Sequence, residues 1–212
     1  MKEGIIERSY YTEKIRPYIG QPIIKILTGQ RRIGKSCILK QLMDIIRGMD
    51  SDANIIYINK ELKEFSEILT DNDLYKSITS QLDKNKNNYV FVDEIQEVPS
   101  FQHTLRSLLA EGSCDIYCTG SNANMLSGEL ATFMAGRYME FPIHSLSYKE
   151  FLLFHQLEDN NQSLIKYLRI GGMPYLIHFK GEEQLCFDYL QNLYSTILLK
   201  DVIARKQIRN VD

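Results

Sequence analysis

The sequence predicts an α/β protein in which a parallel β-sheet is covered by helices on both faces and is followed by a small helical lid. Short apolar runs alternate with segments whose apolar residues recur at spacings of three and four. The apolar runs are continuous, which is typical of parallel strands buried on both faces. After residue 145 no strand-like alternation remains, so we expect a sheet domain over residues 1–145 and a helical lid over residues 146–212.

Strands and helices are expected to alternate through the sheet domain. Five strands are expected near residues 23–27, 54–59, 89–92, 115–119 and 138–141. The helices that connect them are expected near residues 35–47, 73–82, 100–111 and 126–134. Asp71 or Asn72 could cap the second of these helices, and Gly112 is typical of a residue that ends one.

The lid is expected to contain helices alone. Ser147 and Glu150 have the spacing of a capping box, which predicts a helix that begins there. Further helical segments are expected near residues 164–170, 175–179 and 182–205.

The composition argues against several functional classes. A net charge of −2 gives no general attraction to nucleic acid or to an anionic membrane surface. The sequence has no apolar run long enough to predict a membrane span, and its charged N-terminus lacks the apolar core of a signal peptide. We therefore expect a cytoplasmic protein. Because Asp212 directly follows an apparent helix, we also expect the chain to stop before a further C-terminal domain.

A glycine-rich stretch links the first expected strand to the first expected helix. It spans Gly29 to Ser36 and reads G-x-x-x-x-G-K-S, the Walker A phosphate loop. The glycines let backbone N–H groups turn toward phosphate oxygens, Lys35 supplies a cation for the β- and γ-phosphates, and Ser36 offers a hydroxyl to Mg²⁺. An incidental glycine turn is the alternative, and the flanking strand and helix argue against it. The expected nucleotide-binding residues are Gly29, Gln30, Arg31, Arg32, Ile33, Gly34, Lys35, Ser36 and Cys37.

Two acidic residues follow the third expected strand. Asp93 and Glu94 come directly after the apolar residues 89–92, which is the form of a Walker B motif. A buried parallel strand brings its carboxyl end to the sheet edge where ligands bind, so these acids are expected beside the phosphate loop. Asp93 can hold Mg²⁺ through water, and Glu94 can polarise the attacking water. An acidic helix start is the alternative.

Polar residues at the ends of later strands are weaker candidates. Thr119, Ser121 or Asn122 could contact the γ-phosphate or the attacking water, although an ordinary turn explains the pattern equally well. Arg137 precedes the fifth expected strand, where it could reach a phosphate bound by a neighbouring subunit. A surface arginine is the alternative, and composition alone favours it.

Several stretches together resemble one known family. They are residues 27–36, 92–99, 119–127, 135–137, 142–151 and 171–174. In this order they are similar to prokaryotic AAA+-type P-loop ATPases in which an ATPase core precedes a C-terminal domain of unknown function. These are relatives of the archaeal ATPases and the STAND nucleotidases, and the resemblance covers roughly residues 8–209.

The resemblance implies a P-loop NTPase fold, a three-layer AAA+-like sandwich with a five-stranded parallel sheet, the Walker strand at its centre and a helical lid. It implies that Ser121 is the sensor residue and that Arg137 is the arginine finger. Residues 172–174 are a candidate for the lid segment near the adenine, and Arg169 is the nearest match to a second sensor arginine. The family's C-terminal domain is expected to be absent from this chain.

The motifs and the resemblance together predict Mg²⁺-dependent ATP binding and hydrolysis coupled to a conformational change. Glu94, Ser121 and Arg137 are the expected catalytic residues, and Ser36 and Asp93 the expected metal ligands. The expected partners are ATP and further copies of this chain, joined through Arg137. A nucleotide-dependent, DNA-associated module of a mobile-element or defence system is the alternative, although the net charge does not support a DNA partner. A small-molecule kinase is disfavoured by the paired acids and the late arginine.

Overall fold

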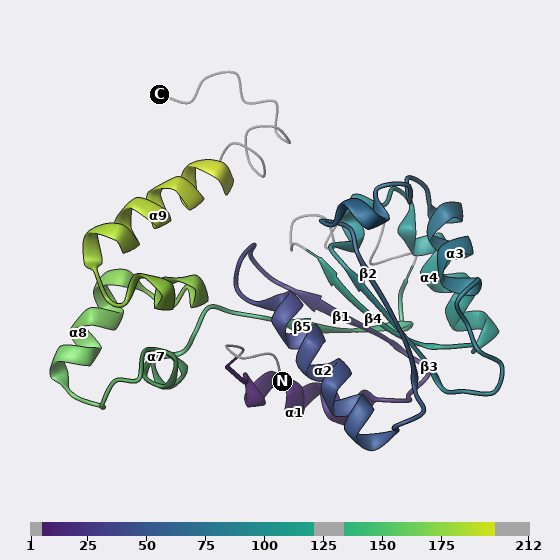
Figure 1. The fold of residues 1–212 in the computed structure, drawn as a ribbon, viewed down its shortest axis with the longest axis horizontal. Coiled ribbons are helices and arrows are strands. Elements are labelled where there is room, and N and C mark those ends of the chain that lie inside the picture. Colours follow the sequence, from purple (N-terminus) through teal and green to yellow (C-terminus); the bar gives the residue numbers. More distant parts are fainter. Residues whose placement is uncertain (1–5, 121–133, 198–212) are drawn as a thin grey trace. The chain divides into compact units, whose positions relative to one another are not determined.

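The computed structural model describes residues 6–120 and 134–197 of the 212-residue chain. The chain divides into two compact units, Met1–His144 and Ser145–Asp212. We call them the sheet unit and the helical unit (Figure 1). Within the described residues, no helix combines the length and the apolar character that crossing a membrane requires.

The sheet unit is built on five parallel strands. They are β1 (Ile24–Thr28), β2 (Asn54–Asn59), β3 (Asn88–Asp93), β4 (Asp115–Gly120) and β5 (Tyr138–Pro142). Their order across the sheet is β2-β3-β4-β1-β5, and every neighbouring pair is parallel. The expectation of the Walker strand at the centre is wrong, because β4 is central and the Walker A strand β1 lies between β4 and β5.

Helices cover both faces of this sheet. The longer ones are α1 (Ser9–Ile15), α2 (Lys35–Met49), α3 (Asp71–Thr79) and α4 (Phe101–Glu111). Short 3₁₀ segments lie at Arg16–Tyr18 (η1), Lys63–Phe65 (η2) and Ile95–Glu97 (η3). Figure 1 shows α1 and α2 on one side of the sheet and α3 and α4 on the other. This confirms the three-layer α/β fold that the sequence predicts.

The main differences from the sequence prediction lie at helix starts. The α1 helix is absent from the prediction. The α3 helix begins at Asp71 and not near residue 73, because the Thr70 side chain accepts a hydrogen bond from the backbone N–H of Asp73. The Asp73 side chain accepts one from the Thr70 N–H in return, a reciprocal cap. The helix expected near residues 126–134 falls almost wholly outside the described residues.

The helical unit contains three α-helices and one 3₁₀ segment within the described residues. They are α7 (Tyr148–His155), α8 (Asn161–Ile170), η4 (Pro174–Phe179) and α9 (Glu183–Ile197). The expected capping box is present, with Ser147 and Glu150 capping α7 reciprocally. The Phe151 side chain is fully buried and packs on Tyr167 of α8, with ring centroids 5.1 Å apart.

Candidate active site

The loop from β1 to α2 depends on two glycines. Gly29 has φ +139°, and a Cβ atom there would lie 2.3 Å from the carbonyl oxygen of Ile143. Gly34 has φ +92° and is the N-cap of α2, so its backbone is left-handed where the helix begins. No side chain caps α2. The N–H groups of its first turn are therefore available to an anion.

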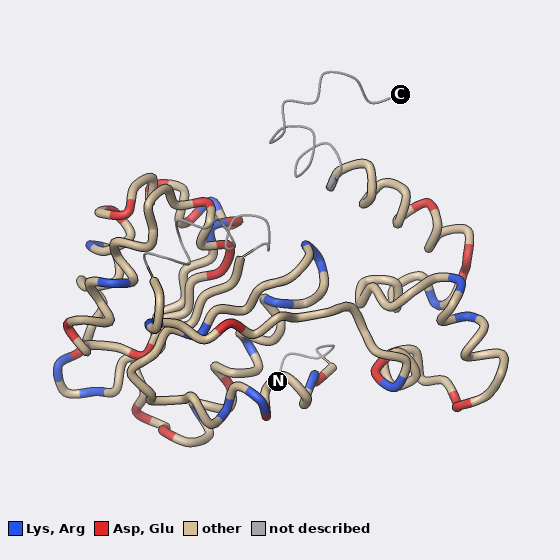
Figure 2. The backbone as a smooth tube through the Cα atoms, turned by 180° about the vertical axis from the view of Figure 1, so that it is seen from behind, with Lys and Arg blue, Asp and Glu red and all other residues tan. Residues whose placement is uncertain are grey.

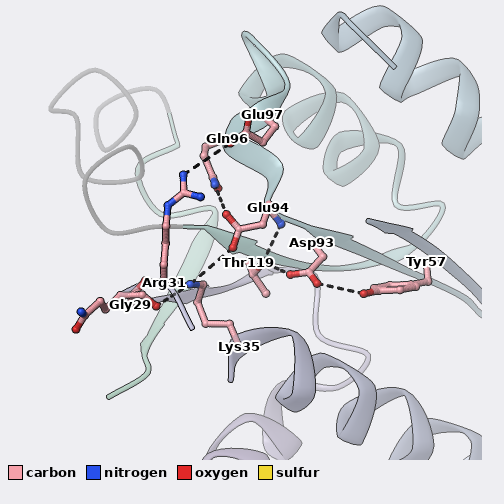
Figure 3. A network of polar contacts seen from close by, with 10 residues as sticks. Gly29, Arg31, Lys35, Tyr57, Asp93, Glu94, Gln96, Glu97 and Thr119 are labelled. Carbon is pink, nitrogen blue, oxygen red and sulfur yellow. Dashed lines mark hydrogen bonds and ion pairs between the residues drawn. The ribbon is translucent and has the colours of Figure 1, made fainter. Parts of the chain in front are cut away.

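Lys35 is the buried cation of this loop. Its side chain is almost wholly enclosed, and its Nζ donates hydrogen bonds of 3.0 Å to the carbonyls of Gly29 and Gln30 (Figure 3). The same Nζ lies 3.8 Å from Oε1 of Glu94. Burial lowers the pKa of Lys35, while the charges of Glu94 and Asp93 oppose that shift. The ammonium thus stands between the phosphate loop and the acids of β3.

The other loop residues surround this lysine in different ways. Ile33 is buried and anchors the loop in the core. Arg32 is exposed and has φ +64°, and Arg31 Nη2 lies 4.0 Å from Oε1 of Glu97. Half-buried Ser36 and exposed Cys37 occupy the first turn of α2.

Asp93 is held on both carboxylate oxygens at the end of β3. It is buried, and the Thr119 hydroxyl of β4 donates to its Oδ1. The Tyr57 hydroxyl of β2 donates to its Oδ2 at 3.1 Å. Burial, together with the Asp93 charge, raises the pKa of Tyr57, because both disfavour a phenolate beside a carboxylate. The carboxylate therefore has a fixed orientation.

Glu94 follows in a left-handed turn, with φ +55° and ψ +50°. Its backbone N–H donates to the Thr119 hydroxyl at 2.9 Å, so one hydroxyl connects both acids of the motif. Its carboxylate is buried and accepts a hydrogen bond from Nε2 of Gln96. Figure 3 shows the Glu94 side chain lying between Gln96 and Lys35.

An arginine that the sequence analysis did not single out supports the loop from behind. Arg8 is 3% exposed, and its Nη1 donates hydrogen bonds of 3.0 Å to the carbonyls of Ile33 and His144. Its guanidinium also lies 4.6 Å from the ring centroid of Tyr11. Arg8 thereby joins the phosphate loop to the segment that follows β5. No local pattern in the sequence marks these contacts.

Of the remaining expected residues, Arg137 is not brought to this site. Ser121 lies outside the described residues. Arg137 precedes β5, and the parallel pairing of Tyr138 with Ile24 puts it at the amino-terminal ends of the strands. The phosphate loop lies at their carboxyl ends. Arg137 therefore does not approach Lys35 of its own chain. Of the candidates Thr119, Ser121 and Asn122, the described residues include only Thr119, which lies in β4 and contacts both acids.

The described residues fit Mg²⁺ and a nucleoside triphosphate. Two buried carboxylates, Asp93 and Glu94, face one buried lysine, so a bound cation would balance the remaining negative charge of this cluster. Within residues 6–120 and 134–197 no group of three or more His, Cys, Asp or Glu side chains could hold a metal ion by itself. Mg²⁺ does not need such a group, since it is usually held by one or two carboxylates, water and substrate phosphates.

The class of protein follows from this fold and site, a P-loop nucleotide-binding protein of the AAA+ type. A family model described as an AAA domain matches residues 21–152. The chain therefore belongs to the AAA domain family, within the prokaryotic AAA+-type P-loop ATPases.

Other proteins resemble this chain to different degrees. An uncharacterized protein of Haemophilus influenzae is 33% identical over 217 residues, which cover 99% of this chain and 54% of that protein. The chain spans about half the length of the curated relatives that it matches. The structure of Hsp104 of S. cerevisiae in its casein complex matches with a TM-score of 0.56 and 13% identity, covering 94% of this chain and 39% of that one. C. elegans PCH-2 matches with a TM-score of 0.52 and 16% identity, covering 80% and 51%. These two structures show the fold, and family and fold support nucleotide binding and hydrolysis in general.

Proposed function

We propose that this chain binds ATP together with Mg²⁺, hydrolyses the bond that joins the γ-phosphate to ADP, and couples binding and hydrolysis to a conformational change. The observation that carries the proposal is the position of the Lys35 ammonium. It lies between two carbonyls of the phosphate loop and the Glu94 carboxylate, at the carboxyl edge of a parallel sheet. Membership of the AAA domain family supports the same chemistry.

Binding uses the loop and the start of α2. The uncapped N–H groups of the first turn of α2 donate hydrogen bonds to the phosphate oxygens, and Lys35 places its charge against the β- and γ-phosphates. Ser36 and Asp93 are the residues that would hold Mg²⁺, with Asp93 acting through water. When bound, the ion neutralises negative charge on the phosphates. Tyr57 and Thr119 keep Asp93 in place for this role.

Hydrolysis uses Glu94 as the base. A water oxygen forms a bond to the γ-phosphorus while the bond from that phosphorus to the β,γ-bridging oxygen breaks. The electron pair of the broken bond stays on ADP, next to Lys35, and a proton of the water passes to Glu94. The products are ADP and inorganic phosphate, and Glu94 then releases its proton to solvent.

Coupling involves parts of the chain outside this cluster. We assign the sheet unit as the ATPase core and the helical unit as its lid. Ser121 is the proposed sensor of the γ-phosphate. Arg137 is the proposed finger for the site of a neighbouring copy, since it lies at the sheet edge opposite its own phosphate loop.

The experiment that tests the proposal is phosphate release from ATP by the purified chain, with Mg²⁺ or with EDTA, and with or without DNA. The proposal expects phosphate release that EDTA abolishes. Stimulation by DNA would favour the DNA-associated alternative. The distribution of charged residues does not itself support a DNA partner, because Figure 2 shows Lys and Arg interspersed with Asp and Glu along each unit.

A further inference from the structure

Within the part of the chain that the structure describes, the Gln96 amide has a hydrogen-bond partner for its nitrogen but none for its oxygen. Gln96 belongs to η3 (Ile95–Glu97), two residues after Glu94, and its Nε2 donates to Oε2 of Glu94 (Figure 3). Its Oε1 atom is buried and has no hydrogen-bond partner among the described residues. A buried acceptor without a donor costs about 1–3 kcal/mol, so such an atom in a site calls for an explanation.

The orientation of this amide is determined by its neighbour. Turning it over would set Oε1 against the Glu94 carboxylate, and two acceptors would then face each other. The left-handed backbone of Glu94 also matters, because it bends the chain sharply just before η3. The Gln96 amide is thus fixed with its donor on Glu94 and its acceptor enclosed beside it.

We infer that Gln96 is a further catalytic residue, which holds the Glu94 carboxylate through Nε2 and receives a hydrogen bond from the attacking water through Oε1. This inference rests on the proposed ATP hydrolysis. A water molecule has two O–H groups, and the site then offers two acceptors, Glu94 and Gln96. With both hydrogens engaged, a lone pair of the water oxygen is left for the γ-phosphorus. The proton still passes to Glu94, and Gln96 keeps all of its own protons.

The first test replaces Gln96 with leucine, which has a similar size and neither donates nor accepts. In Gln96→Leu we expect kcat for ATP hydrolysis to fall roughly 10- to 100-fold, the size of losing one or two hydrogen bonds near a charge. The Kd for MgATP, measured by calorimetry, should stay within about twofold, since the phosphate and metal contacts proposed above do not involve Gln96. The melting temperature reports whether the variant folds.

The matched control is the same substitution at the other end of the sheet unit. The Gln81 side chain is exposed, and its Nε2 donates a hydrogen bond to the backbone carbonyl of Ser77. The backbone carbonyl of Gln81 accepts a hydrogen bond from the Asn54 side chain at the start of β2. Gln81→Leu removes the same amide and should leave kcat unchanged. Gln96→Asn keeps the amide but draws it back by one methylene, so it should lose activity in the same direction and serves if the leucine variant fails to fold.

The outcomes separate this inference from the proposed function. An active wild type with a fully active Gln96→Leu overturns the role of Gln96 and leaves the proposed function standing. Loss of MgATP affinity in step with kcat shows a structural role and also overturns it. A wild type that neither binds nor hydrolyses ATP overturns the proposed function itself. In the Glu94→Gln background, Gln96→Leu should cost no further activity in single-turnover assays, and an independent further loss contradicts the shared water.

Discussion

Replacing Arg8 with methionine tests whether a buried cation organises the phosphate loop. Methionine keeps an unbranched stem of similar reach and removes the guanidinium. The structure assigns two hydrogen bonds of 3.0 Å to its Nη1, one to Ile33 and one to His144. Hydrogen bonds from a charged group contribute about 1.5–3 kcal/mol each, and the variant no longer buries a charge, so we expect a net loss of about 2–4 kcal/mol.

That loss is large enough to measure by thermal unfolding. For a chain of this size 1 kcal/mol shifts Tm by about 2–4 °C, so Arg8→Met should melt roughly 4–16 °C below the wild type. The Ile33 carbonyl belongs to the phosphate loop, and we therefore expect weaker MgATP binding as well. Binding to the folded state raises Tm, so the shift that MgATP produces should be smaller in Arg8→Met at equal ATP concentration.

The control for Arg8 is an arginine on the surface. Arg16 lies 3.5 Å from Glu13, and their side chains are 52% and 65% exposed. Such a pair contributes about 0–1 kcal/mol, so Arg16→Met should change Tm little. If Arg8→Met melts within 2 °C of Arg16→Met and binds MgATP as tightly, the guanidinium does not organise the loop and the reasoning fails.

Three further predictions concern the site and its geometry. Tyr57→Phe should lose about 1.5–3 kcal/mol near pH 8 with the hydrogen bond to Asp93. Because the pKa of Tyr57 is raised in the folded protein, its stabilising contribution is complete below the unfolded value of 10.0 and is lost as pH rises above that value. Denaturant titrations should therefore show that the difference in free energy of unfolding between wild type and Tyr57→Phe narrows above pH 10. A difference that stays constant with pH would contradict the raised pKa. Gly29→Ala should abolish MgATP binding in calorimetry, because its Cβ would lie 2.3 Å from the Ile143 carbonyl; tight binding would refute this. Arg137→Ala should lower turnover only at concentrations where copies associate, checked by activity against chain concentration beside light scattering, and an unchanged rate in a confirmed oligomer would count against the finger.

The sequence predicted the fold well because the signals for strands are local. All five strands begin and end within one or two residues of the expected positions, since each is a short segment rich in apolar residues. The order of strands is a property of long-range pairing, which explains the wrong expectation about the central strand. The α1 helix was missed because it is only seven residues long and has no side-chain cap.

The site was predictable where a motif names its chemistry. Lys35, Asp93 and Glu94 come together as their motifs suggest, while the catalytic and binding roles of the expected residues remain predictions. Tyr57 and Arg8 were missed because their partners lie far along the chain. The hydrogen bond from Arg8 to His144 spans 136 residues, and the one from Tyr57 to Asp93 spans 36. The one feature of the sequence that could have pointed to the Tyr57–Asp93 hydrogen bond is a tyrosine among the aliphatic residues of β2.

Single-turnover phosphate release, measured beside MgATP affinity, tests the central assignment most directly. Glu94→Gln removes the proposed base and keeps its shape, so the variant should bind MgATP normally and release phosphate at least 100-fold more slowly. Lys35→Ala removes the buried ammonium and should lower MgATP affinity at least tenfold. Unchanged phosphate release by Glu94→Gln, or near-normal affinity in Lys35→Ala, would contradict the assignment of this cluster as an ATPase site.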